Sequence, residues 1–188
     1  YKGKRISALS TGIGADNIDI VLNELDALFN IDLETRKIKK EKKSLTIIRI
    51  GTSGALQPDI PVDSFLVSNY GIGFDGLAGF YKNLSDPDEL EIEKAFFSQV
   101  NWGVPTVKPY VAGGDKELID LLSEGANSGI TITGNGFYGP QGRVLRLETK
   151  QPNLNEQLTN FEFNGLKMMN FEMETSALYS LGGMMEHR

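Results

Sequence analysis

Short apolar runs alternate along the chain with segments in which apolar residues recur at helical spacing. Side chains alternate along a strand and repeat about every 3.6 residues along a helix, so the two patterns predict different elements. The runs that predict strands lie at residues 5–10, as a buried strand, and at 45–50, 64–68, 129–133 and 167–171. Helices are predicted at residues 18–28, 116–122 and 174–185. This alternation is typical of an α/β domain with a mixed or mostly parallel sheet.

Polar and turn-forming residues mark the ends of these elements. Asp16 and Asn17 lie directly before the first helix and predict its N-cap, because their side chains accept hydrogen bonds from free helix amides. Pro58 and Pro61 bracket a turn ahead of the strand at 64–68. No internal repeat or break in composition divides the chain, so the pattern predicts a single domain.

Two stretches lack a clean helix or strand pattern. Residues 36–43 form a basic run, which we interpret as a solvated connection between a helix and a strand. Residues 71–103 are rich in glycine and aromatic residues and predict irregular excursions over the sheet. Their aromatic residues form either a subunit interface or a satellite hydrophobic cluster: Phe74, Phe80, Tyr81, Phe96, Phe97 and Trp102.

Composition removes several classes of function. The 188 residues suffice for one domain with a real core, and 40% hydrophobic and 23% charged residues are ordinary for a globular protein. A formal net charge of −6 disfavours non-specific binding to nucleic acid or to an anionic membrane. The chain has no cysteine, and the single His187 leaves little for a histidine metal site or a catalytic triad, so we expect no metal. We also expect a cytoplasmic protein, because no signal peptide and no apolar run of roughly 20 residues is present.

The first candidate for chemistry is Arg49-Ile50-Gly51-Thr52-Ser53-Gly54. An arginine on a strand, followed by a turn of small residues, places a guanidinium, a hydroxyl and backbone amides where one anion can bind them. The alternative is a tight turn that ends a buried strand. The arginine argues against that alternative, because a buried charge needs a partner.

The second candidate is Phe171-Glu172-Met173-Glu174-Thr175, at a junction between a strand and a helix. Two carboxylates two residues apart could hold the vicinal hydroxyls of a sugar, and this binding strengthens if positive charge develops on the ring. In the alternative interpretation, Glu174 simply favours a helix N-terminus, where negative charge is stabilised.

The third candidate is Phe137-Tyr138-Gly139-Pro140-Gln141-Gly142-Arg143. The Gln141 amide both donates and accepts, and Arg143 donates a fork of hydrogen bonds. Together they match the acceptor–donor–acceptor edge of a uracil ring, on which Phe137 could stack. The alternative is a polar loop after a strand.

The fourth candidate, Ser10-Thr11-Gly12-Ile13-Gly14, resembles a phosphate-binding turn. It lacks the spacing of a dinucleotide-binding motif and the lysine-serine pair of a P-loop. We therefore interpret it mainly as a structural turn that lines a site.

In this order and at roughly these separations, the four segments resemble nucleoside phosphorylases of the uridine phosphorylase type, from Lys2 to about Tyr179. Residues 10–14 and 49–55 are similar to the superfamily as a whole. The Phe137 to Arg143 segment is similar to members that act on uridine, and residues 170–174 are similar to the family's ribose motif. The resemblance implies a three-layer α/β/α domain with a central mixed β-sheet.

The resemblance also assigns roles to individual residues. The phosphate-binding residues are Arg49, Gly51 and Thr52. The ribose hydroxyls are held by Glu174 and the backbone of Met173, with Glu172 at the border of the sugar pocket. The uracil edge is bound by Gln141 and Arg143, with Phe137 facing the base. The catalytic set that follows is Arg49, Gln141, Arg143 and Glu174.

The activity implied by the resemblance is the reversible phosphorolysis of uridine to uracil and ribose 1-phosphate. The glycosidic bond stretches, the sugar gains oxocarbenium character, and phosphate captures it from the opposite face. Inorganic phosphate is the co-substrate, and no organic cofactor or catalytic metal is implied. Members assemble as dimers that associate into hexamers, so we expect a homo-oligomer.

The sequence also departs from the family. Members begin with further strands that bear a glycine-rich turn and an arginine for phosphate, take an arginine and a histidine from a neighbouring subunit, and end with a further strand and helix. We therefore expect residues 1–188 to be a single nucleoside phosphorylase domain that lacks its N-terminal strands and its C-terminal strand and helix. Asn17 stands where some bacterial members have a serine that binds a monovalent cation, so the resemblance does not extend to that ion.

Three alternatives remain at this point. A purine nucleoside phosphorylase shares the fold, but Gln141 and Arg143 argue against it. A nucleosidase uses water in place of phosphate. Arg49 argues against a nucleosidase, because a hydrolase needs no residue to bind phosphate. A noncatalytic nucleoside-binding protein on the same fold is disfavoured by the presence of all four catalytic candidates.

Overall fold

The apolar run expected as a strand at residues 129–133 forms the centre of the fold. In the computed structural model, which describes residues 3, 5–82 and 85–188, it belongs to β6 (Asn127–Thr133). Its parallel neighbours are β4 (Leu66–Gly73) and β8 (Leu166–Glu172). Antiparallel strands extend this sheet: β5 (Tyr110–Gly113) beside β4, and β3 (Gly54–Ala55) and β7 (Glu162–Phe163) beside β8. The described residues thus give a mixed sheet of six strands in the order β3-β8-β6-β4-β5, with β7 on β8.

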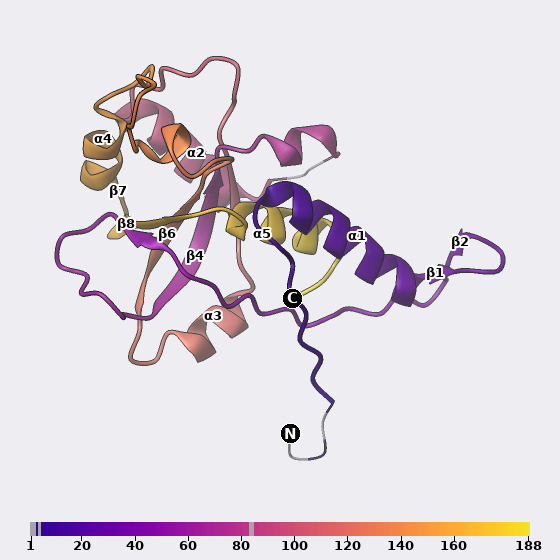
Figure 1. Ribbon diagram of the computed structural model, residues 1–188. Coiled ribbons are helices and arrows are strands. Elements are labelled where there is room, and N and C mark those ends of the chain that lie inside the picture. The colour runs from indigo at the N-terminus through magenta and orange to yellow at the C-terminus, as the bar shows by residue number, and fades with distance from the viewer. Residues whose placement is uncertain (1–2, 4, 83–84) are drawn as a thin grey trace.

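Helices cover both faces of this sheet (Figure 1). On one face, α2 (Pro87–Gln99) and α4 (Leu154–Asn160) bury the main core against the strands. On the other face lies α5 (Thr175–Met184), with α1 (Ala15–Asn30) packed on it. The short α3 (Lys116–Leu122) lies before β6. The expected three-layer α/β/α arrangement with a central mixed sheet is confirmed.

Strand alternation explains how one sheet serves two helical layers. Ile130 and Ile132 of β6 are fully buried against the α2 and α4 layer. Thr131 and Thr133 point to the opposite face, where Thr133 contacts the first turn of α5. Burial of each large aliphatic side chain stabilises the fold by about 1.5–3 kcal/mol, so the first face holds the sheet together. On the second face, β6 presents two buried threonines.

Five other elements expected from periodicity are present near the expected residues. The helix expected at 116–122 matches α3, and the helices expected at 18–28 and 174–185 are α1 and α5. The strands expected at 64–68 and 167–171 are β4 and β8, with β4 running on to Gly73.

Two expected strands are not strands in the structure. Residues 5–10 are exposed and belong to no described ladder, so the prediction of a buried strand there is wrong. Residues 45–50 keep the alternation of a strand, with Leu45, Ile47 and Arg49 half-buried and the residues between them exposed. The backbone of this segment is bonded to Arg188, beyond α5, through Ile47 N and Leu45 O, and Ile47 packs on the α1–α5 cluster. Strand propensity yields a strand only where a neighbouring strand supplies hydrogen bonds.

The irregular stretch expected at 71–103 contains a helix that the pattern missed. Helix α2 starts with a capping box: the Asp86 carboxylate accepts from Glu89 N at 2.8 Å, and Glu89 Oε2 accepts from Asp86 N at 3.0 Å. Pro87 occupies the first turn. The sequence Asp-Pro-x-Glu carries this signal, so the helix start was readable.

The cap expected for the first helix is also wrong. Gly14, not Asp16 or Asn17, is the N-cap residue of α1, and it makes no side-chain cap.

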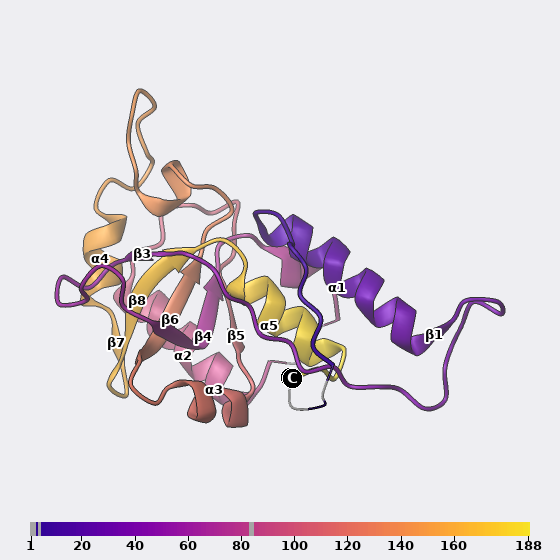
Figure 2. The same cartoon turned by 60° about the horizontal axis from the view of Figure 1, so that its bottom comes forward.

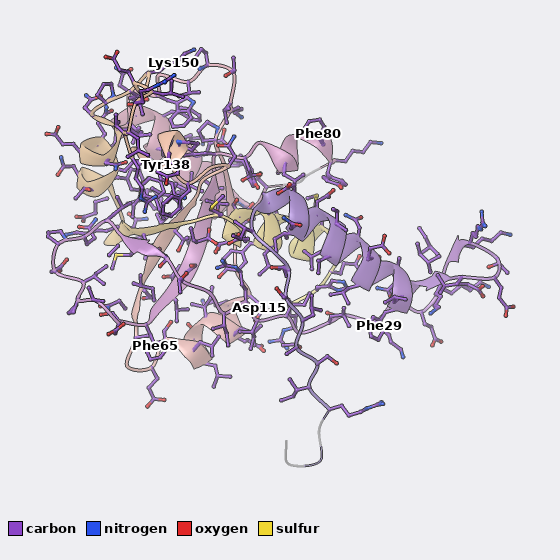
Figure 3. All side chains as sticks on the ribbon, viewed as in Figure 1. Phe29, Phe65, Phe80, Asp115, Tyr138 and Lys150 are labelled. Carbon is purple, nitrogen blue, oxygen red and sulfur yellow. The ribbon has the colours of Figure 1, made fainter. Side chains whose placement is uncertain are left out.

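The aromatic residues of this stretch divide between core and surface. Phe74 and Phe96 are buried in the main core, and Trp102 packs on them with its ring centroid 4.5 Å from that of Phe74. They belong to the central core rather than to a satellite cluster. Phe80, on the short 3₁₀ helix η1 (Leu77–Phe80), is 87% exposed and lies apart from the sheet (Figure 3).

The basic run at 36–43 is exposed throughout, as expected of a solvated connection. Part of it is the strand β2 (Lys37–Ile38), which pairs with β1 (Ile31–Asp32) in a hairpin beyond the end of α1 (Figure 1). Lys42 forms an ion pair of 2.8 Å with Glu186. Elsewhere, no helix among the described residues has the length and apolar character needed to cross a membrane.

Candidate active site

The candidate segments meet where β6 and β8 reach their C-terminal ends. β8 ends at Glu172, and α5 starts at Thr175. The turn at residues 51–54 reaches the same place because Gly54 of β3 pairs with Phe171 of β8. In α/β proteins, ligands bind at the carboxyl ends of parallel strands, where loops and helix N-termini converge. The carboxyl ends of β6 and β8 are therefore where a ligand is expected to bind.

Arg49 lies between the two glutamates of the candidate ribose segment. Its Nη1 is 3.1 Å from Glu172 Oε2, and its Nη2 donates to Glu174 Oε2. The glutamate side chains are 3% and 5% exposed, and that of Arg49 is 24% exposed. Two nearly buried carboxylates require a cation or several donors, and one guanidinium serves both. The partner expected for a charged arginine on this segment is thus a pair of carboxylates.

The Glu172 carboxylate is already hydrogen-bonded by groups of the protein. Its carboxylate accepts from Glu174 N at 2.9 Å, Thr175 N at 2.9 Å and the Thr133 hydroxyl at 2.7 Å. It therefore caps α5, although it precedes the helix, and capping of this kind stabilises a helix by about 0.5–2 kcal/mol. Nothing in the sequence indicated Thr133, because its contact depends on the register of β6 and β8.

Glu174 takes a different role from the one suggested by its position at a helix N-terminus. It is the N-cap residue of α5 but makes no side-chain cap. Its Oε1 accepts instead from the amide of Gly14 at 2.6 Å. The glycine turn at 10–14 therefore lines the site, as interpreted from the sequence, and its direct contact with Glu174 was not foreseen.

The segment at residues 137–143, called here the base loop, gathers the expected recognition side chains. Arg143 Nη1 donates to the Gln141 side-chain carbonyl and to Phe137 O, the latter at 2.8 Å. The guanidinium carbon lies 4.0 Å from the centroid of the Phe137 ring, within cation–π range. Gln141 is buried in the 3₁₀ helix η2 (Gly139–Gln141), and Asn155 Nδ2 donates to its backbone carbonyl at 3.1 Å.

The base loop lies directly against the turn at 51–54. A Cβ added at Gly54 would be 3.0 Å from Arg143 Nη2. A side chain at this position would require the guanidinium to move by a few tenths of an ångström. Two segments almost 90 residues apart are therefore neighbours at this point, which the sequence did not reveal.

Two cavities border these residues. A groove of about 1350 Å³ is lined by Arg49, Gly51 and the exposed Thr52. A second cavity of about 640 Å³ is lined by Arg143 and Tyr138. The second falls within the roughly 300–1,000 Å³ typical of small-molecule sites. Figure 2 shows the loop after η2 projecting away from the sheet at this end of the molecule.

The structure brings the expected residues together in two clusters joined by a turn. Arg49, Glu172 and Glu174 form one polar cluster, and Phe137, Gln141 and Arg143 form another. The turn at 51–54 connects the two. Met173 is half-buried between the two glutamates.

Comparison with known proteins gives a consistent family. The family model described as "Phosphorylase superfamily" matches residues 1–188. The uridine phosphorylase of Thermococcus kodakarensis is 28% identical over 189 residues, covering 96% of this chain and 53% of that protein. The Brevibacillus brevis "Purine nucleoside phosphorylase DeoD-type" is 25% identical over 181 residues, covering 96% of this chain and 58% of that protein. The chain thus spans little more than half the length of these relatives.

Solved structures show the same relationship. A crystal structure of a Trypanosoma brucei nucleoside phosphorylase, whose description reports uridine phosphorylase activity, superposes with a TM-score of 0.85 at 28% identity. The match covers 100% of this chain and 69% of that one. A Schistosoma mansoni uridine phosphorylase in complex with thymine shares the fold at a TM-score of 0.58 and 22% identity, over 95% of this chain and 56% of that one.

Proposed function

The chain belongs to the phosphorylase superfamily, and from this premise we propose that the complete protein catalyses the reversible phosphorolysis of uridine to uracil and ribose 1-phosphate. The observation that carries the proposal is the contact between the Gln141–Arg143 pair and the turn at 51–54. In the proposed assignment, the donors to the base edge lie beside the phosphate-binding turn that follows Arg49. Phosphorolysis requires adjacent binding sites for the nucleoside and for phosphate.

Base recognition follows from the hydrogen-bonding inventory of the base loop. The uracil edge presents an N–H between two carbonyl oxygens. The Gln141 amide accepts from such an N–H and donates to one carbonyl, and the Arg143 fork donates to a carbonyl. The Phe137 ring, 53% exposed beside Arg143, is available to face the base.

The ribose would be held by Glu174 with the backbone of Met173. As the C1′–N1 bond breaks, its electron pair moves to the base and positive charge develops on the sugar ring. The Glu172 and Glu174 carboxylates stabilise that positive charge, and Gln141 and Arg143 stabilise the negative charge on the leaving base. Preorganised donors of this kind contribute about 2.7–4 kcal/mol each in other enzymes.

Phosphate would bind at Arg49, Gly51 and Thr52. A guanidinium carries five N–H donors, so the two bonds of Arg49 to the glutamates leave others for phosphate oxygens. A phosphate oxygen then forms the new bond to C1′ as the base departs. We propose inorganic phosphate as the sole co-substrate, with no organic cofactor or metal.

The cellular role and the oligomeric state of the protein follow from the proposed reaction and the family resemblance. A pyrimidine salvage or catabolic role in the cytoplasm follows from the proposed reaction. A homo-oligomer, dimeric or hexameric, is proposed because the resemblance places family sites at subunit interfaces.

A purine nucleoside phosphorylase is the second candidate. The match to the Brevibacillus brevis protein favours it, since it covers as much of this chain as the match to the Thermococcus kodakarensis uridine phosphorylase. The pairing of Gln141 with Arg143 favours uridine.

The test is uracil release from uridine by the complete protein, with and without phosphate, in parallel with inosine. We expect phosphate-dependent release of uracil and little hypoxanthine. Release without phosphate would identify a nucleosidase, and preference for inosine would identify the purine enzyme. No turnover by a folded oligomer would leave a nucleoside-binding protein.

A further inference from the structure

Asp75, just after β4, forms a hydrogen-bonded cluster that the proposed reaction does not use. Its Oδ1 accepts from the Tyr110 hydroxyl at 2.9 Å and from Leu77 N at 2.8 Å. Its Oδ2 accepts from the Ser176 hydroxyl at 2.9 Å. Tyr110 comes from β5 and Ser176 from the first turn of α5, so one carboxylate ties three elements together.

The backbone of β4 is shaped around this cluster. A Cβ added at Gly73 would lie 2.6 Å from Asp75 Oδ2 and would overlap the Tyr110 ring. Burial, together with the charge of Asp75, raises the pKa of the Tyr110 hydroxyl above its ordinary value. The Tyr110 hydroxyl therefore keeps its proton, and its bond to Asp75, to a more alkaline pH than an ordinary tyrosine.

Ser176 connects this cluster to the candidate active site. Its hydroxyl bonds Asp75, while its backbone N donates to the Thr133 hydroxyl oxygen at 2.9 Å. Thr133 in turn donates to Glu172 Oε1 at 2.7 Å. Because Thr133 has one proton, accepting from Ser176 leaves that proton for Glu172. The chain of contacts ends at Arg49, 3.1 Å from Glu172.

We infer that Asp75 is a positioning residue, which fixes Ser176 and, through Thr133, orients Glu172 and the phosphate-binding Arg49. The inference rests on the proposed function for the role of Arg49. Asp75 touches neither the base loop nor the turn at 51–54 through any of these bonds, so it acts only through Ser176 and Thr133.

The charge of Asp75 is difficult to explain by packing alone. The N-terminal end of α5 already has Glu172 and Glu174, and Arg49 is the cation paired with both. A third carboxylate beside the same helix turn is repelled by the other two. Its three donors and the helix dipole offset this repulsion, which is the arrangement expected where orientation matters.

The experiment uses the complete protein with Asp75→Asn, and Tyr179→Phe as the matched control. Tyr179 lies on α5, as Ser176 does, and its hydroxyl donates to Ser68 O at 2.8 Å rather than to the cluster. Its ring lines the groove beside Arg49, and phenylalanine keeps that ring. We expect Asp75→Asn to lower kcat and raise the KM for phosphate by about tenfold or more, with a KM for uridine within about twofold. Tyr179→Phe should leave all three constants unchanged.

A double-mutant cycle separates orientation from general destabilisation. If Asp75 acts through Ser176, Ser176→Ala should have little further effect on kcat in the Asp75→Asn background. Asp75→Asn and Tyr179→Phe should instead combine additively. Additive effects of Asp75→Asn and Ser176→Ala would overturn the inference, as would equal changes in the KM for phosphate and uridine.

Crystal structures of the ligand-free wild-type protein and Asp75→Asn give a readout independent of turnover. We expect the Thr133–Glu172 bond to break and Arg49 to leave Glu172 in the variant. Unchanged positions of Glu172 and Arg49 would overturn the inference. If the wild-type protein splits inosine, the kinetic arm uses inosine. If it splits no nucleoside, the proposed function fails and the crystal structures alone decide the role of Asp75.

Discussion

The backbone amide of Gly14 donates a 2.6 Å hydrogen bond to Oε1 of Glu174, across 160 positions of sequence. The other oxygen of Glu174 accepts from Arg49. One carboxylate therefore joins the N-terminus of α1, the arginine segment and the start of α5. Its orientation is fixed before any ligand arrives, which reduces the ordering cost of binding.

Arg143→Ala should lower kcat/KM for uridine by about 100- to 1,000-fold, because it removes a donor to the departing base. The fold should remain intact, since the Arg143 side chain is only half-buried. Steady-state kinetics with thermal unfolding checks both expectations. The exposed Arg146→Ala, three residues further along, is the matched control. Near-normal kinetics of Arg143→Ala would remove its assignment to the uracil edge.

Arg49→Ala should chiefly weaken the use of phosphate. It also leaves Glu172 and Glu174 without their shared cation, so the free energy of unfolding should fall by about 1–3 kcal/mol. The rate as a function of phosphate concentration and urea unfolding test the two effects. Arg49→Lys keeps the charge but not the fork, and should recover stability more than phosphate affinity. An unchanged phosphate dependence in Arg49→Ala would count against the assigned role.

Gly54→Ala should act through Arg143. The added methyl group would lie 3.0 Å from Arg143 Nη2, so the guanidinium would shift by a few tenths of an ångström relative to Gln141. We expect the KM for uridine to rise by about two- to fivefold with a small change in stability. In the Arg143→Ala background the same substitution should have little further effect on that KM. A full effect in that background would show that Gly54 acts by another route.

Asp86→Ala should destabilise the protein by about 0.5–2 kcal/mol by removing half of the capping box of α2. Activity at temperatures below unfolding should be unchanged, because α2 lies on the face of the sheet opposite α5. Urea unfolding and uridine kinetics measure the two outcomes. Loss of activity without loss of stability would contradict a purely structural role for this cap.

Stability at alkaline pH should depend on Tyr179. Burial raises the pKa of its hydroxyl to about 12, from an ordinary value of 10.0. The unfolded chain loses this proton first, so the stability that Tyr179 provides is complete below pH ~10 and is lost as the pH rises toward ~12. The free energy of unfolding should therefore fall more steeply over this range in the wild-type protein than in Tyr179→Phe. Parallel declines would disprove the contribution.

The sequence by itself determined the elements whose pattern is local. The hydrophobic run at 129–133 and the stripe of α1 identify their elements because side-chain periodicity is a property of neighbouring residues. The Asp86 capping box was equally local, and α2 was missed because only two of its residues, Ile92 and Phe96, are buried, which leaves a weak apolar stripe. The types of residue at the site were also readable, since a carboxylate pair and a Gln-x-Arg segment limit the chemistry available to a ligand.

Only the tertiary structure decided which of these residues meet. Residues 45–50 have strand character but lie along α5, because no neighbouring strand offers them hydrogen bonds. Glu172 caps α5, while Glu174 accepts from the amide of Gly14. The sequence motif does not indicate which of the two glutamates caps the helix. The contact of Gly54 with Arg143, like that of Thr133 with Glu172, depends on strand order and register. Such contacts are set by long-range pairing and packing, whose free energies depend on the whole fold rather than on neighbouring residues.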